Sequence, residues 1–521
     1  MSDTIKHECG IAFVRLLKPL DFYLKKYGTP FYGLNKMQIL MEKQHNRGQD
    51  GAGLANIKLF PKPGHVYINR IRSNDDTPIK EIFQRIYDRI EHAVAADPSR
   101  LNNPAWLKEH VEFTGEVFLG HLRYGTFGKN DIENVHPVSR ENNWMTRSLV
   151  LAGNFNLTNI DELYERLIDL GQYPPAKTDT VTILERIGHF LDRENEDKYR
   201  YFKDKGYSKR EITDLLARHI DLKEILSLAA RRWDGGYVMA GMIGHGDAFV
   251  MRDPCGIRPA YYYRDDEVVV AASERAVIQT TFNVPYENVQ ELAPGHALLV
   301  RRDGDVSDER FIAPQEVRPC SFERIYFSRG SDQDIYRERK RLGRLLVPQI
   351  LKSIDGDIEN TVFSYIPNTA ESAFFGLVEG LDAHCAETRV QKIMAGRDTR
   401  RRDAPHCRFK SASYMNRNYR NGSTSMHNNK NAHVYHAGRR TRRPGGPCIR
   451  RHLRHHPPGC GQPRDTRRFD RAGHHAAPQH HPHPRPAQTQ KDRRLLVGAS
   501  DPLSGLLRHR HVAVGRLRRI P

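Results

Sequence analysis

A chain of 521 residues is longer than one hydrophobic core usually organises, so we expect two or more domains. The formal net charge of the whole chain is +19, but residues 397–521 alone carry +23, with 29 Lys and Arg against 6 Asp and Glu. Residues 1–396 hold 53 against 57, a net of −4, so the body does not point to a nucleic-acid-binding protein. The composition also argues against a secreted or membrane protein, because Met1–Glu8 lacks an apolar signal core, no apolar run could cross a bilayer, and the seven Cys lack the regular spacing of a disulfide framework.

We therefore expect a cytoplasmic protein with reduced thiols. Between residues 9 and 310, short apolar strands alternate with helices, which is an α+β pattern. The expected elements include, in chain order, a helix over 180–191 and strands over 249–251, 268–272 and 297–300.

A second amphipathic helix, over 334–350, would open another domain. A buried strand over 361–366, a turn at Pro367-Asn368-Thr369 and a helix through Leu381 follow it. Strand, polar loop and helix in this order are typical of the start of an α/β domain. Beyond about residue 396 there is no Glu, and Arg, His and Pro cluster without periodic apolar residues. We expect this tail, over 397–521, to be disordered.

Cys9 is the candidate nucleophile, because Cys9-Gly10 stands at the head of an apolar strand. An N-terminal Cys can use its own α-amino group, which titrates near ~8, as the base that takes the thiol proton. This chemistry requires Cys9 to be the first residue, so residues 1–8 are predicted to be a propeptide removed by self-cleavage. The alternative for an isolated Cys is a buried structural residue.

Four later segments each carry one part of a glutamine site. Residues 47–53 supply a Gly-rich loop for close backbone approach, and Arg123 in 120–126 offers a planar guanidinium to a carboxylate. In the segment 154–159, Asn154 gives a side-chain amide and a following N–H for an oxyanion hole. In 178–180, Asp179 gives a carboxylate for an ammonium group, before a helix that Thr178 or Asp179 could cap. Taken singly, these residues have ordinary alternatives: a surface ion pair, a turn residue and a helix cap.

The order of these segments resembles the glutaminase domain of the amidophosphoribosyltransferase family, within the class II glutamine amidotransferases. The stretches 252–259, 272–274 and 292–295 extend the resemblance over most of residues 9–310. It implies a four-layer αββα N-terminal-nucleophile (Ntn) hydrolase fold. It also implies these roles: Cys9 as nucleophile, Asn154 and the Phe155 N–H as oxyanion hole, Arg123, Thr126 and Asp179 as glutamine ligands, and Arg47 as a further glutamine-site residue near the nucleophile.

Two positions depart from the family pattern. Many relatives have Gly where Phe155 stands and His where Gly153 stands. A backbone donor tolerates the first change, whereas the second is expected to alter how tightly the loop closes.

The second half resembles the opening of the family's phosphoribosyltransferase domain. The segments 320–329, 336–343 and 363–370 carry this likeness, so residues 320–395 are expected to begin that α/β domain. The family uses Mg²⁺ on phosphoribosyl pyrophosphate (PRPP), and its members are expected to form homo-oligomers. The later strand with two carboxylates and the Gly-Thr-Thr loop that would bind the 5′-phosphate are missing from the tail as written, so we expect an incomplete domain that has lost its Mg²⁺ site.

A shifted reading frame recovers the missing motif. If each residue is coded by the last base of one codon and the first two of the next, 467–475 decodes as Asp-Asp-Ser-Ile-Val-Arg-Gly-Thr-Thr. We infer that the chain leaves its coding frame between about Gly380 and Asn431. The alternative is a genuine basic, His-rich tail that binds nucleic acid or a metal, for which His480-His481-Pro482-His483 supplies ligand types.

The resemblance implies glutamine hydrolysis and transfer of ammonia to PRPP in purine biosynthesis, with this chain defective in the phosphoribosyl step. Small-molecule substrates are expected, with no specific nucleic acid, no membrane and no metal held by the chain. One alternative is another class II amidotransferase, of the hexosamine-phosphate or asparagine synthetase type. The other is a non-catalytic regulatory or nucleic-acid-binding protein.

Overall fold

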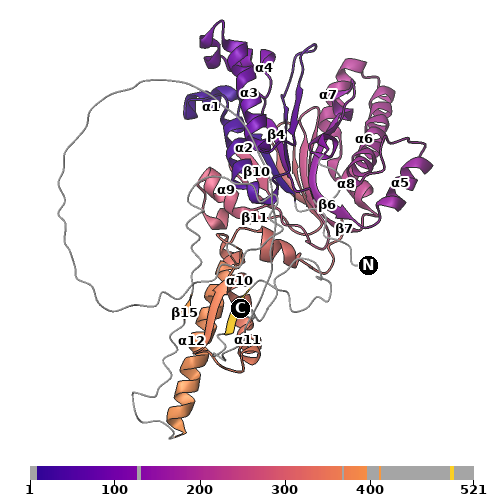
Figure 1. Ribbon diagram of the computed structural model, residues 1–521. Coiled ribbons are helices and arrows are strands. Elements are labelled where there is room, and N and C mark those ends of the chain that lie inside the picture. The colour runs from indigo at the N-terminus through magenta and orange to yellow at the C-terminus, as the bar shows by residue number, and fades with distance from the viewer. Residues whose placement is uncertain (1–8, 126–130, 367–368, 396–409, 412–492, 498–521) are drawn as a thin grey trace, which may run out of the picture. The chain divides into compact units, whose positions relative to one another are not determined.

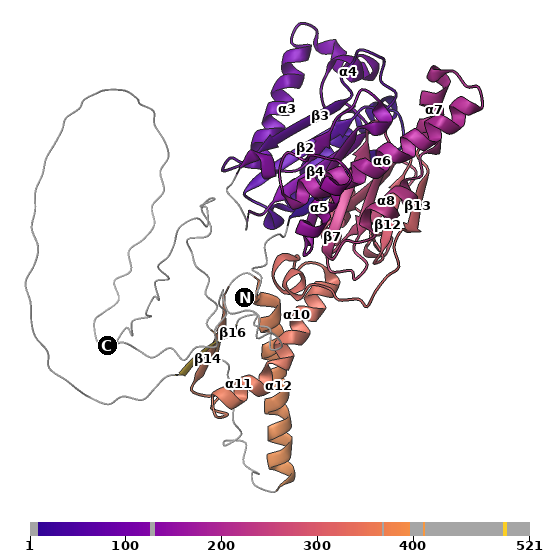
Figure 2. The same cartoon turned by 90° about the vertical axis from the view of Figure 1, so that its right-hand side faces the viewer.

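The computed structural model describes residues 9–125, 131–366, 369–395, 410–411 and 493–497. The predicted propeptide, residues 1–8, and Thr126 lie outside the described residues. Mixed helices and antiparallel sheets confirm the α+β class (Figures 1 and 2). No helix in the described part of the chain is long and apolar enough to cross a membrane.

Sheet A has seven antiparallel strands. In spatial order they are β11 (Gln290–Glu291), β9 (Tyr261–Arg264), β10 (Val268–Ala272), β1 (Gly10–Leu16), β4 (Val117–Arg123), β2 (Gly51–Ile57) and β3 (Ile68–Ser73). Sheet B has six antiparallel strands. They are β13 (Val306–Arg310), β12 (His296–Val300), β8 (Ala248–Arg252), β7 (Gly235–Ile243), β6 (Leu149–Leu157) and β5 (Val138–Arg140). The three strands predicted over 249–251, 268–272 and 297–300 are confirmed as β8, β10 and β12.

Side chains from both sheets share one core. Ile11 and Phe13 of sheet A pack in the same buried cluster as Val238 and Ala240 of sheet B. Alternate residues of a strand point to opposite faces, so every second residue of β1 and β7 enters this core. The two sheets therefore face one another, and both are buried on their inner faces.

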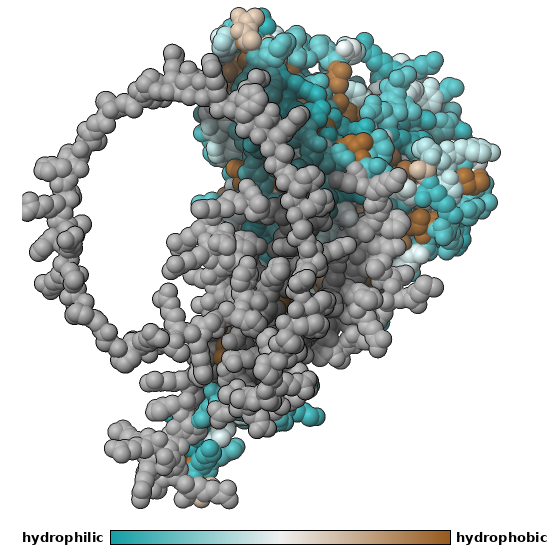
Figure 3. Space-filling view, viewed as in Figure 1, coloured by the Kyte–Doolittle hydropathy of each residue, from teal (hydrophilic) through white to brown (hydrophobic). Residues whose placement is uncertain are grey.

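Helices cover the outer face of each sheet (Figures 1 and 2). The helices on sheet A are α1 (Leu20–Tyr27), α2 (Tyr32–Lys43), α3 (Pro78–Val94), α4 (Pro104–His110) and α9 (Arg275–Phe282). Those on sheet B are α5 (Ile160–Asp169), α6 (Asp179–Asp204) and α8 (Leu222–Ala230), with α7 (Lys209–His219) packed on α6. The helix predicted over 180–191 is confirmed, and it runs thirteen residues further. On the face seen in Figure 3 the described surface over these elements is mainly hydrophilic, with scattered hydrophobic residues.

After sheet B the chain forms a small second core around β14 (Thr361–Tyr365). The single helix predicted over 334–350 is two helices, α10 (Gln333–Leu345) and α11 (Val347–Ser353). Pro348 explains the break, because proline lacks an N–H and its ring clashes with the preceding turn of a continuous helix. The strand predicted over 361–366 is confirmed as β14.

The helix after β14, α12, spans Glu371–Met394 and so passes Leu381, its predicted end. No Pro or Gly interrupts residues 382–394, which favours continuation. Cys385 on this helix is disulfide-bonded, so the prediction of seven reduced thiols is wrong at this position. Only spatial proximity decides such a bond, and Cys spacing along the chain does not reveal it.

Within the predicted disordered tail, two short stretches pair in parallel with β14: β15 (Lys410–Ser411) and β16 (Arg493–Val497). The prediction that all of 397–521 is disordered is therefore wrong for these two stretches, whose backbone pairs with β14. The rest of 397–521 lies outside the described residues, as do the reading-frame interpretation's key positions 467–475.

Lys58, at the end of β2, is a buried lysine far from the edge of sheet A where Cys9 lies. Burial lowers its pKa from 10.5 to about 8. The pKa of Lys58 is lower in the folded than in the unfolded chain, so the folded state disfavours the charged amine. Below about pH 8 the amine is charged in both states and the full cost to stability is present. Between about pH 8 and the unfolded pKa the folded state binds fewer protons, so the free energy of unfolding rises with pH. Lys58→Met is therefore expected to raise the free energy of unfolding by about 1 to 3 kcal/mol at about pH 7.

That gain should shrink as the pH of the unfolding measurement approaches about 10. The exposed Lys62 offers a matched control: Lys62→Met should change stability little at either pH. An equal gain from Lys58→Met at both pH values would show that the charge of Lys58 is not the cause of its cost to stability.

Candidate active site

Cys9 and Arg123 lie at the same edge of sheet A. Gly10 pairs with Leu122 across β1 and β4, so antiparallel register brings Cys9 level with Arg123. Ile11 and Phe13 face the core between the sheets, and alternation turns the side chain of Cys9 to that same face. Cys9 is 6% exposed and Arg123 is 6% exposed. The structure thus brings together Cys9, the predicted nucleophile, and Arg123, the predicted partner of the glutamine carboxylate.

The Gly-rich segment 47–53 is clamped against the end of β4. A Cβ at Gly48 would lie 2.5 Å from the carbonyl carbon of Leu122, so only glycine allows this approach. Asp50 completes the contact: its N–H donates to the Arg123 carbonyl at 3.1 Å, and its carboxylate accepts from the Gly125 N–H at 2.6 Å. The predicted close backbone approach is confirmed.

Arg47 lies directly behind the nucleophile strand, since a Cβ built on Gly10 would be 3.3 Å from the Cβ of Arg47. Its side chain is fully buried. The Nε atom donates to Glu274 Oε1 at 2.8 Å, and Nη1 lies 2.8 Å from Glu323 Oε2. Arg47 is therefore near Cys9, as predicted, with its guanidinium held by two protein carboxylates.

Asn154 reaches the same region from sheet B. Val150 and Ala152 of β6 face the core between the sheets, so Asn154 does as well. It is 1% exposed, and its Nδ2 donates to Glu323 Oε1 at 3.1 Å. Glu323 also contacts Arg47, which packs against Gly10. The Asn154 amide, predicted for the oxyanion hole, is therefore linked through Glu323 and Arg47 to the strand that follows Cys9.

The main-chain N–H of Phe155 points away from β7. Tyr237, opposite Phe155 in β7, uses its carbonyl to accept from Asp253 N on its other side at 2.8 Å. In an antiparallel ladder this makes Phe155 and Tyr237 a non-hydrogen-bonded pair, with both N–H groups directed outward. Gly153, two residues earlier, likewise directs its N–H to His136 Nδ1, at 3.4 Å. The orientation is compatible with the predicted oxyanion-hole donor.

Asp179 stands at the first turn of α6. Thr178, not Asp179, caps the helix, and its hydroxyl accepts from Val181 N at 3.2 Å. Thr180, which follows Asp179, forms a hydrogen bond between its Oγ1 and His136 Nε2 at 2.9 Å. Because His136 also reaches Gly153 on β6, this contact brings the Asp179 turn next to the strand of Asn154.

The structure adds three charged residues to which the sequence analysis gave no role: Glu274, Glu323 and Arg258. Arg258 Nη1 lies 3.5 Å from Glu323 Oε1. Its loop is organised by Asp253, whose carboxylate accepts from the N–H groups of Ile257 and Arg258 at 2.9 and 3.1 Å. Burial raises the pKa of the Asp253 carboxyl, an effect that these hydrogen bonds oppose. All three residues stand in stretches quoted for the family likeness, which was the available signal.

The absence of a side chain at Gly153 and the presence of a ring at Phe155 depend on each other. A Cβ at Gly153 would lie 2.6 Å from Phe155 Cδ1 and 2.8 Å from the Val238 carbonyl oxygen. The ring of Phe155 thus fills the space a side chain at position 153 would need. We expect Gly153→His alone to cost about 1 to 3 kcal/mol by overpacking and Phe155→Gly alone about 3 to 5 kcal/mol by creating a cavity.

The double variant, with His at 153 and Gly at 155, should lose less stability than the sum of the single changes in urea unfolding. Strict additivity would show that the two positions do not share one space.

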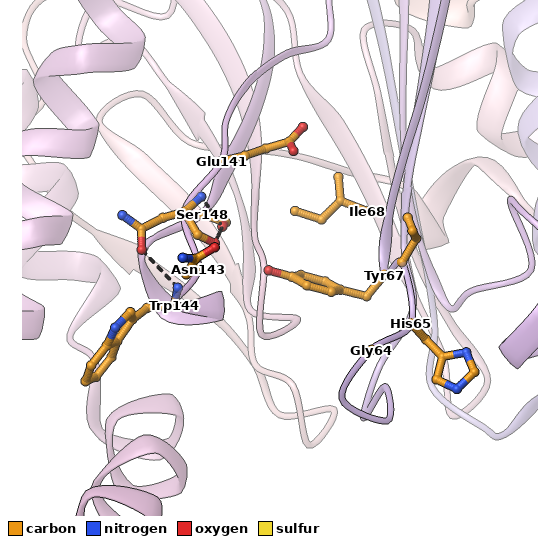
Figure 4. Close-up of a pocket in the computed structure, with 10 residues that line it drawn as sticks. Gly64, His65, Tyr67, Ile68, Glu141, Asn143, Trp144 and Ser148 are labelled. Carbon is orange, nitrogen blue, oxygen red and sulfur yellow. Dashed lines mark hydrogen bonds between the residues drawn. The ribbon is translucent and has the colours of Figure 1, made fainter.

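A cavity of about 820 Å³ lies elsewhere, beside the start of β3 and the segment 141–148 (Figure 4). Figure 4 shows Tyr67 pointing across it toward Asn143 and Ser148. Ile68 pairs with Ile57, at the opposite end of β2 from Gly51 and Arg123. The cavity contains none of the predicted site residues.

No protein-family model matches this chain. It is 25% identical over 367 residues to an amidophosphoribosyltransferase of Pseudomonas aeruginosa, a match that covers 68% of this chain and 61% of that protein. It is 26% identical over 358 residues to an amidophosphoribosyltransferase of Bacillus subtilis, covering 67% and 58%. The chain spans less than two thirds of either relative's length. A solved glutamine PRPP amidotransferase from B. subtilis, complexed with ADP and GMP, matches with a TM-score of 0.46 at 24% identity, over 72% of this chain and 64% of that one.

Proposed function

Because this chain belongs to the amidophosphoribosyltransferase family, we propose that it hydrolyses glutamine at Cys9 and belongs to the step that transfers ammonia to PRPP in purine biosynthesis. The observation that carries the proposal is the convergence of Cys9 and Arg123 from sheet A with Asn154 from sheet B. The four-layer Ntn hydrolase fold belongs to the same proposal. Two facing sheets, each covered by helices, support it.

In the proposed mechanism the α-amine of Cys9, exposed once residues 1–8 are removed, takes the thiol proton. The sulfur then attacks the side-chain amide carbon of glutamine. Negative charge develops on the amide oxygen, where Asn154 Nδ2 and the Phe155 N–H donate to it. The carbon–nitrogen bond breaks, and ammonia leaves with the proton that the amine returns.

The remaining thioester is hydrolysed. Water adds to the carbonyl carbon, the bond to sulfur breaks, and glutamate leaves as the thiol re-forms. Substrate selection is assigned to Arg123, which would pair with the α-carboxylate, and to Asp179, which would pair with the α-ammonium. Thr126 is proposed as a third glutamine ligand, and Arg47 as a residue that shapes the pocket behind Cys9.

Transfer to PRPP is proposed for the family's complete second domain, with Mg²⁺ accompanying the pyrophosphate. Within the described ranges, no group of three His, Cys, Asp or Glu is placed to hold a metal ion. For this chain we propose glutaminase activity without formation of phosphoribosylamine, in the cytoplasm. Homo-oligomers are proposed for the intact family.

One assay tests both parts: glutamate and pyrophosphate are measured after incubation with glutamine, with and without PRPP and Mg²⁺. The proposal expects glutamate in both mixtures and pyrophosphate in neither. Glutamate-coupled pyrophosphate release would overturn the defect, and absence of glutamate release from a chain beginning at Cys9 would overturn the glutaminase assignment.

A further inference from the structure

Glu323 is a buried carboxylate contributed by the segment that follows both sheets. It lies in a short π-helical turn, Glu323–Phe327, and is 1% exposed. Among the described residues, its carboxylate lies 2.8 Å from Arg47 Nη1 and 3.5 Å from Arg258 Nη1, and it accepts from Asn154 Nδ2 at 3.1 Å. Glu274, Arg47, Arg258 and Glu323 are defined here as the Arg47 cluster, and Arg329 Nε lies 3.7 Å from Glu274 Oε2 at its margin.

Burying an isolated carboxylate is costly, so its retention requires pairing. Arg47 and Arg258 supply that pairing and offset the negative charge. This matters for catalysis, because an uncompensated anion beside an oxyanion hole would oppose the charge that develops there. Because Arg47 and Arg258 offset its charge, Glu323 can accept a hydrogen bond from Asn154 without leaving a net negative charge beside the proposed oxyanion hole.

The contact between Glu323 and Asn154 fixes which way the side-chain amide of Asn154 points. Nδ2 faces the Glu323 carboxylate, while Oδ1 is buried and makes no hydrogen bond with the described part of the chain. A carboxylate accepts and cannot donate, so it holds the nitrogen end in place. One hydrogen of Nδ2 binds Glu323, and the second remains for the substrate oxygen.

Glu323 is in turn held by α10. Arg339, 5% exposed on that helix, donates to the carbonyls of Arg324 at 2.9 Å and Ser328 at 2.6 Å. Arg324 pairs with Glu338 of the same helix at 2.6 Å. The turn that carries Glu323 is thus fixed by the first helix of the second half, and its side chain ends at the glutaminase site.

We propose that Glu323 is a positioning residue of the glutaminase site, which orients the amide of Asn154 toward the oxyanion and makes the site depend on the segment after the two sheets. This inference rests on the proposed glutaminase function. It assigns catalytic importance to a residue outside the predicted glutaminase domain, 9–310.

The test compares Glu323→Gln with wild type in the full chain processed to Cys9. Glutamine keeps the size but removes the carboxylate, so kcat for glutamate release should fall by about 10-fold to 100-fold, less than for loss of the donor itself, with KM within about 3-fold. The matched control is Glu316→Gln, an exposed residue of the same connecting segment, which should behave as wild type. Circular dichroism checks that each variant is folded.

A double-mutant cycle separates positioning from general damage. In an Asn154→Ala background, Glu323→Gln should lower kcat by less than about 3-fold, because its target is already absent. An unchanged kcat in the single variant, or the same fold loss in both backgrounds, would overturn the proposal. If Glu323→Gln does not fold, Glu323→Asp keeps the charge while withdrawing it from Asn154, and the same two criteria apply.

The outcomes also distinguish this inference from the proposed function. If wild type releases no more glutamate than Cys9→Ala, the glutaminase proposal itself fails. If wild type is active and Cys9→Ala is not, while Glu323→Gln matches wild type, only the role of Glu323 fails.

Discussion

Replacing Cys9 by alanine should reduce glutamine hydrolysis by about 10⁴-fold or more, since its sulfur forms the thioester in the proposed mechanism. The loss should appear in kcat rather than in glutamine affinity, because Arg123 and Asp179 remain. Steady-state glutamate release and glutamine binding by calorimetry, measured on chains that begin at residue 9, separate the two quantities. Far-ultraviolet circular dichroism should be unchanged.

Cys255 provides the matched thiol control. It is partly exposed, and its Sγ meets Gln315 Oε1 at 3.3 Å, within the part of the chain after β8. Cys255→Ser should retain glutaminase activity within about 3-fold, the range of a surface change. Comparable losses in the two variants would contradict a nucleophile at Cys9.

Asn154→Ala is expected to lower kcat by about 10²- to 10³-fold, the usual cost of removing one oxyanion donor. KM should change much less, because the donor acts on charge that develops only in the transition state. Initial rates over a range of glutamine concentrations give both constants.

The control for Asn154 is another buried asparagine. Asn195 on α6 is fully buried and donates to the carbonyls of Thr146 and Leu191 at 3.0 and 2.8 Å. Asn195→Ala should cost about 1 to 3 kcal/mol in stability by removing these two buried hydrogen bonds. Its kcat should stay near wild type. A similar kcat for the two variants would show that Asn154 acts only through the fold.

The sequence predicted the elements whose signal is local. Three apolar strands at 249–251, 268–272 and 297–300 were recovered because each is a short apolar run between turn signals. The Gly48 approach was predictable because a Gly-rich loop that follows a helix favours close approach of another backbone. Helix ends were less accurate: α12 continues past Leu381, where nothing in the local pattern either stops or requires it.

Contacts between distant segments could not be predicted in this way. Glu323 and Asn154 are 169 positions apart, and no periodicity records that a carboxylate will reach that amide. Likewise, the exclusion of a side chain at Gly153 depends on the ring of Phe155, so two apparent departures from the family form one packing arrangement. The family likeness identified the segments, but their pairing follows only from the register of the two sheets.

Mass spectrometry of the protein after reaction with a diazoketone analogue of glutamine tests whether Cys9 is an N-terminal nucleophile. The modified peptide is expected to begin at Cys9 and to carry the adduct on the Cys9 sulfur, and free glutamine should slow the labelling. An active chain whose N-terminal peptide still begins at Met1, or an adduct on another residue, would contradict it.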